Sequence, residues 1–242
     1  MIVGAVTDIG KIRDINQDFM FVGDVESFPL YIVADGMGGH NAGEVASNMA
    51  VHIIKKVFID NIKRLKDKEN IKRTIEEAIS QANKKIYLES KKVLKYAGMG
   101  TTITLAYIFN NNIYIGHVGD SRAYFATGEK IYQITDDHSL VNELIKNGSI
   151  TPEEAINHPQ KNLITRAVGT SSEIQLDFYM LDYKSDDILI ICSDGLSNML
   201  SDGDIMKLIK SESDVDKACN KLISVANDNG GRDNITVIAI KF

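Results

Sequence analysis

The chain has 242 residues, of which 44% are hydrophobic and 25% are charged, and it contains 18 glycines and 3 prolines. This composition is typical of a soluble globular protein and excludes the collagen-like, fibrous and disordered classes. With 27 basic and 33 acidic residues, the net charge of −6 disfavours binding to nucleic acid, which needs clustered lysine and arginine.

The two cysteines are too few for a disulfide framework or a four-thiolate zinc site. Cys192 lies in an apolar run and Cys219 in a helical pattern, so we expect two buried free thiols in a reducing compartment. The apolar runs are shorter than the roughly 20 residues that a membrane span needs. Residues 1–7 lack the basic segment that opens a signal peptide. We therefore expect a cytoplasmic protein with no membrane span.

The first part of the chain predicts strands followed by long helices. Short apolar runs bounded by turn residues indicate strands at 1–6, 19–22 and 30–34. Apolar residues then recur at helical spacing, which predicts helices at 43–59 and about 70–95, joined by the charged stretch 63–69.

Strand patterns return after the second helix, at 101–109, 113–118, 123–126 and 130–134. Asn110-Asn111-Asn112 indicates a tight hairpin turn between the first two of these strands. Two short helices are predicted next, at 140–146 and 152–156, with Thr151 capping the second. The remaining elements are strands at 175–181, 188–192 and 235–241 and helices at 202–210 and 215–226.

Strands and helices that are grouped in this way favour an α+β fold over alternating βαβ units. The number of strands requires two sheets, and each sheet needs a cover on its outer face. We predict one domain over residues 1–242, a four-layer α-β-β-α sandwich in which two antiparallel sheets are flanked by helical pairs.

Five aspartates lie at the ends of predicted strands: Asp18, Asp35, Asp120, Asp194 and Asp233. A strand that ends in aspartate presents its carboxylate from a rigid base at the rim of the sheet. Asp-Gly is also a common hairpin turn, and we interpret Asp202-Gly203 in that way. A hairpin turn is a weaker interpretation for Asp35, because a glycine-rich loop and a long helix follow it instead of a second strand. It is weaker for Asp194 in the same way.

Carboxylates that converge repel one another. Two unit charges about 4 Å apart cost on the order of 4 kcal/mol at an effective dielectric constant of 20. A cluster of these aspartates therefore implies bound cations, and ligation by oxygen alone suits Mg²⁺ or Mn²⁺. No Cys/His spacing indicates zinc, and no EF-hand loop is present.

The glycine-rich segment 36–44 matches neither the dinucleotide-binding pattern nor the P-loop pattern. It does place His40 beside Asp35 at the start of a helix. We therefore expect His40 to be functional, rather than His52, which sits inside that helix.

A series of short motifs spans nearly the whole chain: Arg13-Asp14-Ile15-Asn16-Gln17-Asp18, Val33-Ala34-Asp35-Gly36-Met37-Gly38-Gly39-His40, Gly98-Met99-Gly100-Thr101-Thr102, Gly116-His117-Val118-Gly119-Asp120-Ser121-Arg122, Asp137-His138-Ser139-Leu140, Ile164-Thr165-Arg166-Ala167-Val168-Gly169, Ser193-Asp194-Gly195-Leu196 and Gly231-Arg232-Asp233-Asn234. In this order they resemble the motifs of the metal-dependent serine/threonine protein phosphatases of type 2C. The fold of that family, a β-sandwich flanked by helical pairs, agrees with the predicted architecture. The chain resembles a stand-alone bacterial catalytic unit.

The resemblance implies two Mn²⁺ or Mg²⁺ ions, and a third in bacterial members, held by Asp18, Asp35, the carbonyl of Gly36, Asp120, Asp194 and Asp233. Asp35 would bridge two ions, and Asp120 with Asp194 corresponds to the third site. Gln17 stands where eukaryotic members carry a glutamate ligand, so Asp18 is expected to serve the second ion, directly or through its water.

The resemblance also implies the groups that handle the substrate. Arg13 would bind the phosphate, a role that suits its planar fork of donors. His40 would be the general acid, Asn234 would orient a water, and residues 139–161, beginning with Ser139, would form a mobile flap beside the active site.

The implied reaction is hydrolysis of phosphoserine or phosphothreonine by direct attack of a hydroxide that two metal ions share, without a covalent phosphoenzyme. By family analogy, a monomer opposing a bacterial serine/threonine kinase is expected. The alternatives are a non-catalytic phosphoprotein-binding module and a hydrolase of small phosphate esters. Occupation of all the motif positions argues against the first, and the acidic balance argues against a nucleic-acid substrate.

Overall fold

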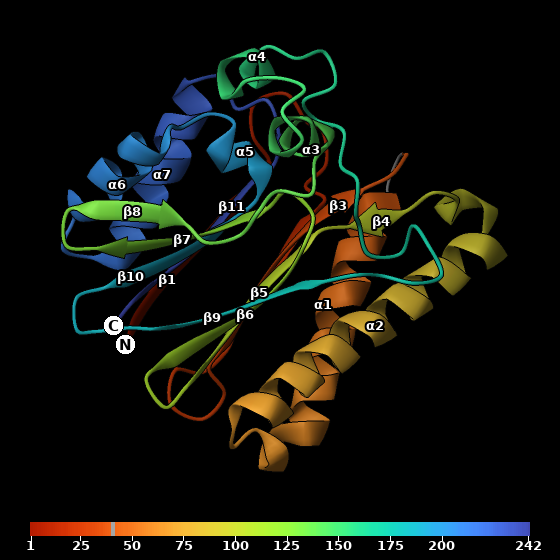
Figure 1. Cartoon of the computed structure of the whole chain (residues 1–242), viewed down its shortest axis with the longest axis horizontal. Helices are drawn as coiled ribbons and strands as arrows, with labels where there is room; N and C mark the ends of the chain where they lie inside the picture. The colour runs from red at the N-terminus through yellow and green to blue at the C-terminus, as the bar shows by residue number, and fades with distance from the viewer. Residues whose placement is uncertain (40–41) are drawn as a thin grey trace.

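The computed structural model describes residues 1–39 and 42–242, which form two antiparallel sheets packed face to face (Figure 1). One sheet contains, in spatial order, β1 (Ile2–Asp8), β11 (Ile235–Lys241), β10 (Ile188–Cys192), β7 (Arg122–Thr127) and β8 (Lys130–Gln133). The other contains β2 (Asp18–Val22), β3 (Leu30–Met37), β5 (Ile103–Phe109), β6 (Asn112–Val118) and β9 (Asp177–Asp182), and β4 (Gly100–Thr101) pairs with the end of β3.

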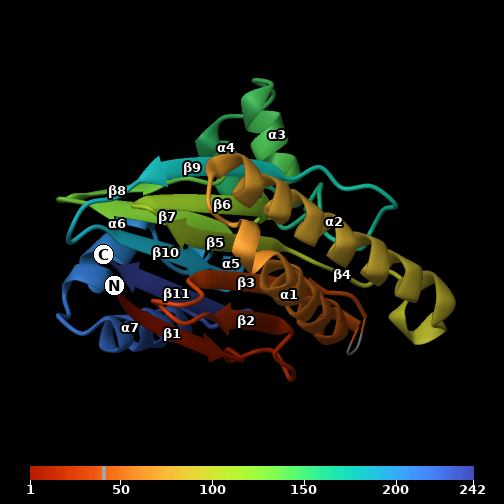
Figure 2. The ribbon, with the colours of Figure 1, turned by 90° about the horizontal axis from the view of Figure 1, so that it is seen from below.

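Two pairs of helices cover the sheets, as Figures 1 and 2 show from different sides. Helices α1 (Ala42–Asn61) and α2 (Lys68–Lys92) pack on the sheet that contains β3, and α6 (Asp202–Lys210) and α7 (Val215–Asp228) pack on the sheet that contains β11. The remaining helices are α3 (Leu140–Lys146), α4 (Pro152–Ile156), α5 (Asp194–Ser197) and the 3-10 turns η1 (Ile62–Arg64) and η2 (Leu94–Tyr96). The predicted four-layer sandwich is confirmed.

Alternation of side chains along the strands creates these layers, because successive residues of a strand point to opposite faces of a sheet. In β3, Tyr31 and Val33 belong to the core between the sheets, whereas Ile32 packs in the core beneath α1 and α2. In β10, Leu189 and Ile191 face the other sheet in the same way. Strands that are buried on both faces explain why the sequence shows continuous apolar runs there.

The close approach of Gly36 and Gly43 determines where the first turn of α1 packs against the end of β3. A Cβ atom added to Gly36 would lie 2.1 Å from the carbonyl oxygen of Gly43, and one added to Gly43 would lie 2.7 Å from Gly36. The Ser47 hydroxyl, one turn further along α1, donates to the Gln17 carbonyl at 2.6 Å. Helix α1 therefore starts directly against the ends of β2 and β3.

Most of the predicted elements are found within a few residues of their expected bounds. The asparagine hairpin is confirmed, with Asn110 and Asn111 at φ 47° and 58°, the left-handed values that such a turn requires. Thr151 caps α4 in a capping box with Glu154, as its position predicted. Both cysteines are free and buried, which is also as expected.

Two local predictions are wrong, and one short helix was not predicted. The strand predicted at 101–109 is split into β4 and β5 at Thr102, where the Asp35 N–H donates to the Thr102 hydroxyl rather than to its carbonyl. The turn proposed for Asp202-Gly203 is the first turn of α6, capped by Ser201. The short helix α5, which begins at Asp194, was not anticipated.

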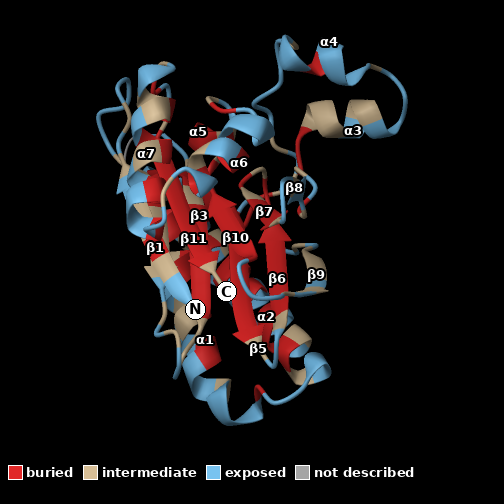
Figure 3. Cartoon of the chain, turned by 90° about the vertical axis from the view of Figure 1, so that its left-hand side faces the viewer, coloured by how far each residue is buried: buried red, intermediate tan, exposed pale blue. Residues whose placement is uncertain are grey.

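Helices α3 and α4 stand away from the body of the molecule, and most of their residues are exposed or partly exposed (Figure 3). They lie within the predicted flap, 139–161. Both ends of that segment are tied together, since Leu140 N–H donates to the Leu163 carbonyl at 2.8 Å and Ser139 forms a bridge with Ile164.

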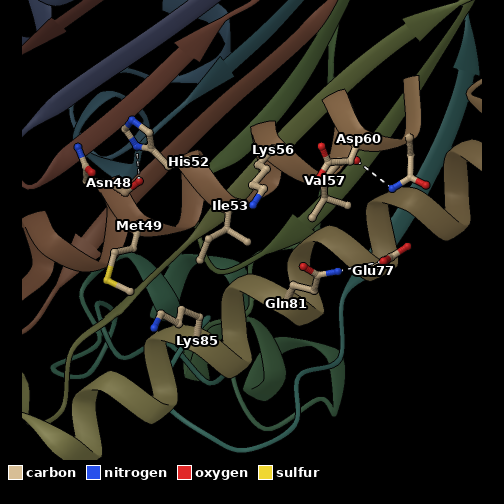
Figure 4. A pocket seen from close by; sticks show the side chains of 11 residues that line it. Asn48, Met49, His52, Ile53, Lys56, Val57, Asp60, Glu77, Gln81 and Lys85 are labelled. Carbon is tan, nitrogen blue, oxygen red and sulfur yellow. Dashed lines mark hydrogen bonds between the residues drawn. The ribbon is translucent and has the colours of Figure 1, made fainter. Parts of the chain in front are cut away.

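A groove of about 590 Å³ runs between α1 and α2 on the outside of the molecule (Figure 4). Met49 and Ile53 of α1 face Gln81 and Lys85 of α2 across it, and His52 at its edge is bonded to the Asn48 carbonyl of its own helix. None of the predicted site residues lines this groove. In the part of the chain that the structure describes, no helix is long and apolar enough to cross a membrane.

Tyr31 provides a test of the core between the sheets. Its hydroxyl is buried and has no hydrogen-bond partner among the described residues, whereas the buried Tyr124 hydroxyl accepts from Arg122 at 2.9 Å. A buried polar group without a partner costs about 1–3 kcal/mol. We expect Tyr31→Phe to leave the free energy of unfolding unchanged or to raise it by about 1 kcal/mol, measured by chemical denaturation.

Tyr124→Phe is the matched control, and it should lower the free energy of unfolding by about 1 kcal/mol because it removes a hydrogen bond. Equal losses of stability in the two variants would contradict this reading of the core.

Candidate active site

An acidic cleft of about 400 Å³ opens where the ends of the two sheets meet. Its lining includes most of the predicted site residues: Arg13, Asp35, Gly36, Asp120, Asp194 and Asp233. These residues come from the β1–β2 loop, the end of β3, the loop after β6, the start of α5 and the loop before β11. The fold thus brings together positions that lie more than 200 residues apart in the sequence, such as Arg13 and Asp233.

Asp35 is held by its own backbone. Its N–H donates to the Thr102 hydroxyl at 2.9 Å, and its carbonyl accepts from the N–H of Thr102 at 2.8 Å and from the Thr101 hydroxyl at 2.9 Å. These bonds, which split the predicted strand at 101–109, fix the end of β3. Thr102 is therefore a functional position that the motif contained but to which we assigned no role.

Asp18 lies directly opposite Asp35 in the pairing of β2 with β3, and it is buried behind the cleft. Its Oδ2 accepts from the hydroxyls of Ser193 and Thr236, both at 2.7 Å. These two donors belong to the other sheet, at the end of β10 and in β11. The Asp18 carboxylate consequently bonds the two sheets together immediately behind the cleft.

Burial raises the pKa of several of these carboxyls. Loss of hydration raises the pKa of Asp18 to about 7, against the opposing effect of its bonds to Thr236 and Ser193, and the nearby Asp194 raises it further. The pKa of Asp194 rises to about 6, chiefly through burial and the neighbouring Asp233. Asp35 and Asp120 show the same direction, again with burial as the largest cause, followed by neighbouring carboxylates. The site is therefore short of positive charge.

Arg13 is the one guanidinium that contacts this acidic group among the described residues, through an Nη2–Oδ2 ion pair of 2.7 Å with Asp233. This contact is the main cause that raises the pKa of Arg13. The Arg13 side chain is 52% exposed, and an ion pair in such a position contributes about 0–1 kcal/mol. Arg13 is consequently free to exchange this partner for another anion at little cost.

Asn234 holds the loop that carries Arg13. Its Oδ1 accepts from the Gln17 N–H at 2.8 Å, and its Nδ2 donates to the carbonyls of Ile9 and Ile15 at 2.9 and 3.0 Å. Its side chain is buried. These three bonds use both N–H donors of the amide and one lone pair of its oxygen, so the side chain positions the loop, and orientation of a water by Asn234 stays a prediction.

Ser139 is placed at the base of the flap and not in the acidic cleft. It is buried, and its hydroxyl accepts from the Asn142 N–H at 3.3 Å as the N-cap of α3. It lines a neighbouring pocket of about 540 Å³ under α3 and α4, which shares Asp120 and Asp194 with the cleft. His40 lies outside the described residues.

Asn198 is a further residue of the site that the sequence reasoning missed. Its Nδ2 donates to Asp194 Oδ2 at 3.0 Å. The spacing of four residues is the signal that could have found it, since residues four apart share one face of a helix. That signal was lost because α5 itself was not predicted.

The comparisons with known proteins agree with this geometry. The family model described as protein phosphatase 2C matches residues 13–236. The chain belongs to the protein phosphatase 2C family. The resemblance found in the motifs is thus confirmed, over a segment that contains every predicted site residue.

Similar proteins cover nearly the whole chain. The serine/threonine phosphatase stp of Listeria monocytogenes is 39% identical over 97% of this chain and 93% of its own length. The structure of the Streptococcus agalactiae serine/threonine phosphatase superposes with a TM-score of 0.93 at 41% identity, covering 98% of this chain and 97% of that one. The catalytic domain of the phosphatase PstP, solved in complex with two manganese ions, gives a TM-score of 0.85 at 32% identity and covers 98% and 96% of the two chains.

The residues that line the cleft fit divalent cations. The Oδ1 atoms of Asp18 and Asp194 are buried and accept no hydrogen bond from any described residue. Among residues 1–39 and 42–242, no three Asp, Glu, His or Cys side chains are arranged to hold one ion between them. Mg²⁺ needs no such group, since it is usually bound by one or two carboxylates with water completing the shell.

The raised pKa values predict how the metal-free protein responds to pH. Asp18 holds a proton up to about pH 7 in the folded chain but only to about pH 4 in the unfolded chain. The folded state then binds the extra proton, so its stability falls as the pH rises. Between pH 6 and 8 the free energy of unfolding should drop by about 1 kcal/mol more in the wild type than in Asp18→Asn.

The measurement is urea denaturation in the presence of a chelator. The amide introduced by Asp18→Asn still accepts bonds from Ser193 and Thr236 but does not titrate, so the variant is the control. The buried His117 and His138, whose pKa values are lowered by burial, give the opposite slope in both proteins and cancel in the comparison. Identical pH profiles for the two proteins would contradict the prediction.

Proposed function

We propose that this chain is a metal-dependent phosphoprotein phosphatase that hydrolyses phosphoserine and phosphothreonine, with residues 1–242 forming one catalytic domain. The observation that carries the proposal is the convergence of Asp35, Asp120, Asp194, Asp233 and Arg13 on one open cleft. The serine/threonine phosphatases of similar sequence and structure support it.

Two divalent ions, Mn²⁺ or Mg²⁺, are proposed to bind in this cleft. Asp18, Asp35, the Gly36 carbonyl, Asp194 and Asp233 would hold these two ions. Asp120 with Asp194 would hold a third. When bound, such ions lower the pKa of a water and neutralise the phosphoryl charge, so that hydrolysis needs no covalent phosphoenzyme. The manganese ions of the PstP catalytic domain support this choice of metal.

Arg13 is proposed to bind the substrate phosphate. Its position at the mouth of the cleft and its half-exposed pairing with Asp233 allow it to turn to a phosphate. A guanidinium donates two parallel bonds to a phosphate, so it holds the phosphoryl group in one orientation and stabilises the charge on its oxygens during transfer. The Asn234 bonds to the loop fix the position from which Arg13 acts.

The general acid for the leaving hydroxyl is proposed to be His40, which follows the glycine-rich turn after Asp35 in the sequence. The described residues on both sides of it lie near the cleft, since Gly38 lines it and Gly43 packs on Gly36. An imidazole titrates near neutral pH and is well suited to donate a proton to a departing alkoxide.

The substrates are proposed to be phosphoproteins in the cytoplasm, including the targets of a serine/threonine kinase that this monomeric phosphatase opposes. The cleft is open, and the exposed helices α3 and α4 beside it offer a surface for a folded partner or an extended peptide. The net charge of −6 disfavours nucleic acid as a substrate.

The experiment that tests this function measures release of phosphate from a phosphothreonine peptide with Mn²⁺, with Mg²⁺ and with a chelator. We expect turnover with either ion and its loss after chelation. Turnover that persists after chelation would rule out the metal-dependent mechanism. Turnover of p-nitrophenyl phosphate without turnover of phosphopeptides or phosphoproteins would instead identify a hydrolase of small esters.

Asp194→Asn tests the proposed metal ligands. Asparagine at this position can still accept the hydrogen bond from Asn198, but it removes the negative charge that would hold a metal ion. A metal ion supplies several kcal/mol of stabilisation in the transition state, so we expect kcat to fall by two or more orders of magnitude. The melting temperature should not fall. Asp202→Asn, in the exposed first turn of α6, is the matched control and should retain full activity; full turnover by Asp194→Asn would exclude this assignment.

A further inference from the structure

His138 belongs to a motif for which the proposed reaction has no role. It is buried at the base of the flap, between β8 and α3. Its carbonyl accepts from the Thr165 N–H at 2.8 Å, where the chain returns from the flap. His138 therefore lies at the point where both ends of the flap join the body of the molecule.

Two hydrogen bonds join His138 to Gly119. The His138 N–H donates to the Gly119 carbonyl at 2.8 Å, and the Gly119 N–H donates to the His138 Nδ1 at 3.0 Å. Gly119 has a φ of +117°, and a Cβ atom there would lie 2.5 Å from Thr102. The backbone at Gly119 is thus held tightly on two sides, and the next residue is Asp120, which lines the cleft.

The bond to Gly119 also decides the tautomer of the imidazole. Because Nδ1 accepts a hydrogen bond, it carries no proton, and the proton of the neutral ring lies on Nε2. That atom is 3.2 Å from Asp177 Oδ2, to which it can donate, and also 3.2 Å from Arg166 Nη1. Arg166 Nη1 donates to Oδ1 of the same Asp177 carboxylate at 3.2 Å. Burial is the largest cause that lowers the pKa of His138, which favours this neutral form.

The ring of His117 packs against the His138 ring at an angle of 41°. The two ring centroids are 4.8 Å apart. Both nitrogens of His117 are used elsewhere, with Thr104 Oγ1 at 2.9 Å and the Asp136 carbonyl at 3.1 Å. The ring of His138 therefore contacts the tilted His117 ring on one side and Asp177 at its far nitrogen, and its Nδ1 points at the Gly119 amide.

We propose that His138 is a positioning residue that couples the base of the flap to the Gly119–Asp120 turn and so sets the direction of the Asp120 carboxylate in the cleft. The inference rests on the proposed function only for the role of Asp120 as a metal ligand. An apolar side chain of equal volume would fill the same space but would leave the buried Gly119 N–H without an acceptor. If His138 served packing alone, the loss of this acceptor would have no effect on the site.

Two substitutions separate the two nitrogens of the ring. In His138→Asn the side-chain carbonyl can take the place of Nδ1 and accept from Gly119. In His138→Gln the longer amide can take the place of Nε2 and donate to Asp177, but no acceptor remains near Gly119. In the metal-free protein we expect the Gly119 amide to exchange its hydrogen at the wild-type rate in His138→Asn and about tenfold faster in His138→Gln.

Amide exchange in β10 provides the reference for an intact fold.

Calorimetric titration with Mn²⁺ is the second measurement. The affinity for the most weakly bound Mn²⁺ ion should be about tenfold lower in His138→Gln than in the wild type and equal to the wild type in His138→Asn, since groups that orient a ligand usually change metal affinity by 10- to 100-fold. Equal Gly119 exchange rates in the two variants, or equal Mn²⁺ affinities, would show that the imidazole only fills space.

A measurement on the wild type keeps the inference testable if neither variant folds. The ¹⁵N spectrum of the imidazole should show a proton on Nε2 and none on Nδ1, with the Gly119 amide coupled to Nδ1 through the hydrogen bond. A proton on Nδ1 would overturn the proposal. Since neither this spectrum nor the exchange experiment needs metal or substrate, failure of the inference is distinguishable from failure of the proposed phosphatase activity.

Discussion

Burial of like charges at one end of the sandwich is the constraint on which the other features of the site depend. Asp18 is buried, and Asp35 and Asp194 are partly buried. Asp194 raises the pKa of Asp18, and Asp18 and Asp194 both raise the pKa of Asp35. Hydrogen bonds from the protein offset only part of the repulsion and the lost hydration, since the buried Oδ1 atoms of Asp18 and Asp194 have no donor among the described residues. The arrangement is therefore stable in its ionised form only with added positive charge.

The surrounding structure holds the carboxylates in place despite their repulsion. Thr102 locks the end of β3, Ser193 and Thr236 hold Asp18, and Asn198 holds Asp194. Each is a short side chain that donates or accepts at a fixed position on a strand end or a helix turn. Rigid supports of this kind keep ligands in position before a cation arrives, so that binding need not order the site.

The layers and the clustering of the aspartates at one cleft could be predicted from the sequence because they depend on local patterns. Buried strands give β-branched runs, and an aspartate at the end of such a run marks the rim of a sheet. The supports could not be predicted, because Ser193 and Thr236 lie 175 and 218 residues from Asp18. Propensity does not encode the bond from the Asp35 N–H to the Thr102 hydroxyl, at which the predicted strand is interrupted, and α5 is too short to show a period. Asn234 was assigned from the motif alone, which does not show which loop its amide reaches.

The bonds of Asp18 also have a consequence for how the chain folds. Since its donors lie near the opposite end of the sequence, these bonds can form only after β2 meets β10 and β11, and contacts between distant segments form late and slowly. Until then each carboxylate stays hydrated and apart from the others. The charges are thus brought together by the same closure of the two sheets that forms the hydrophobic core between them.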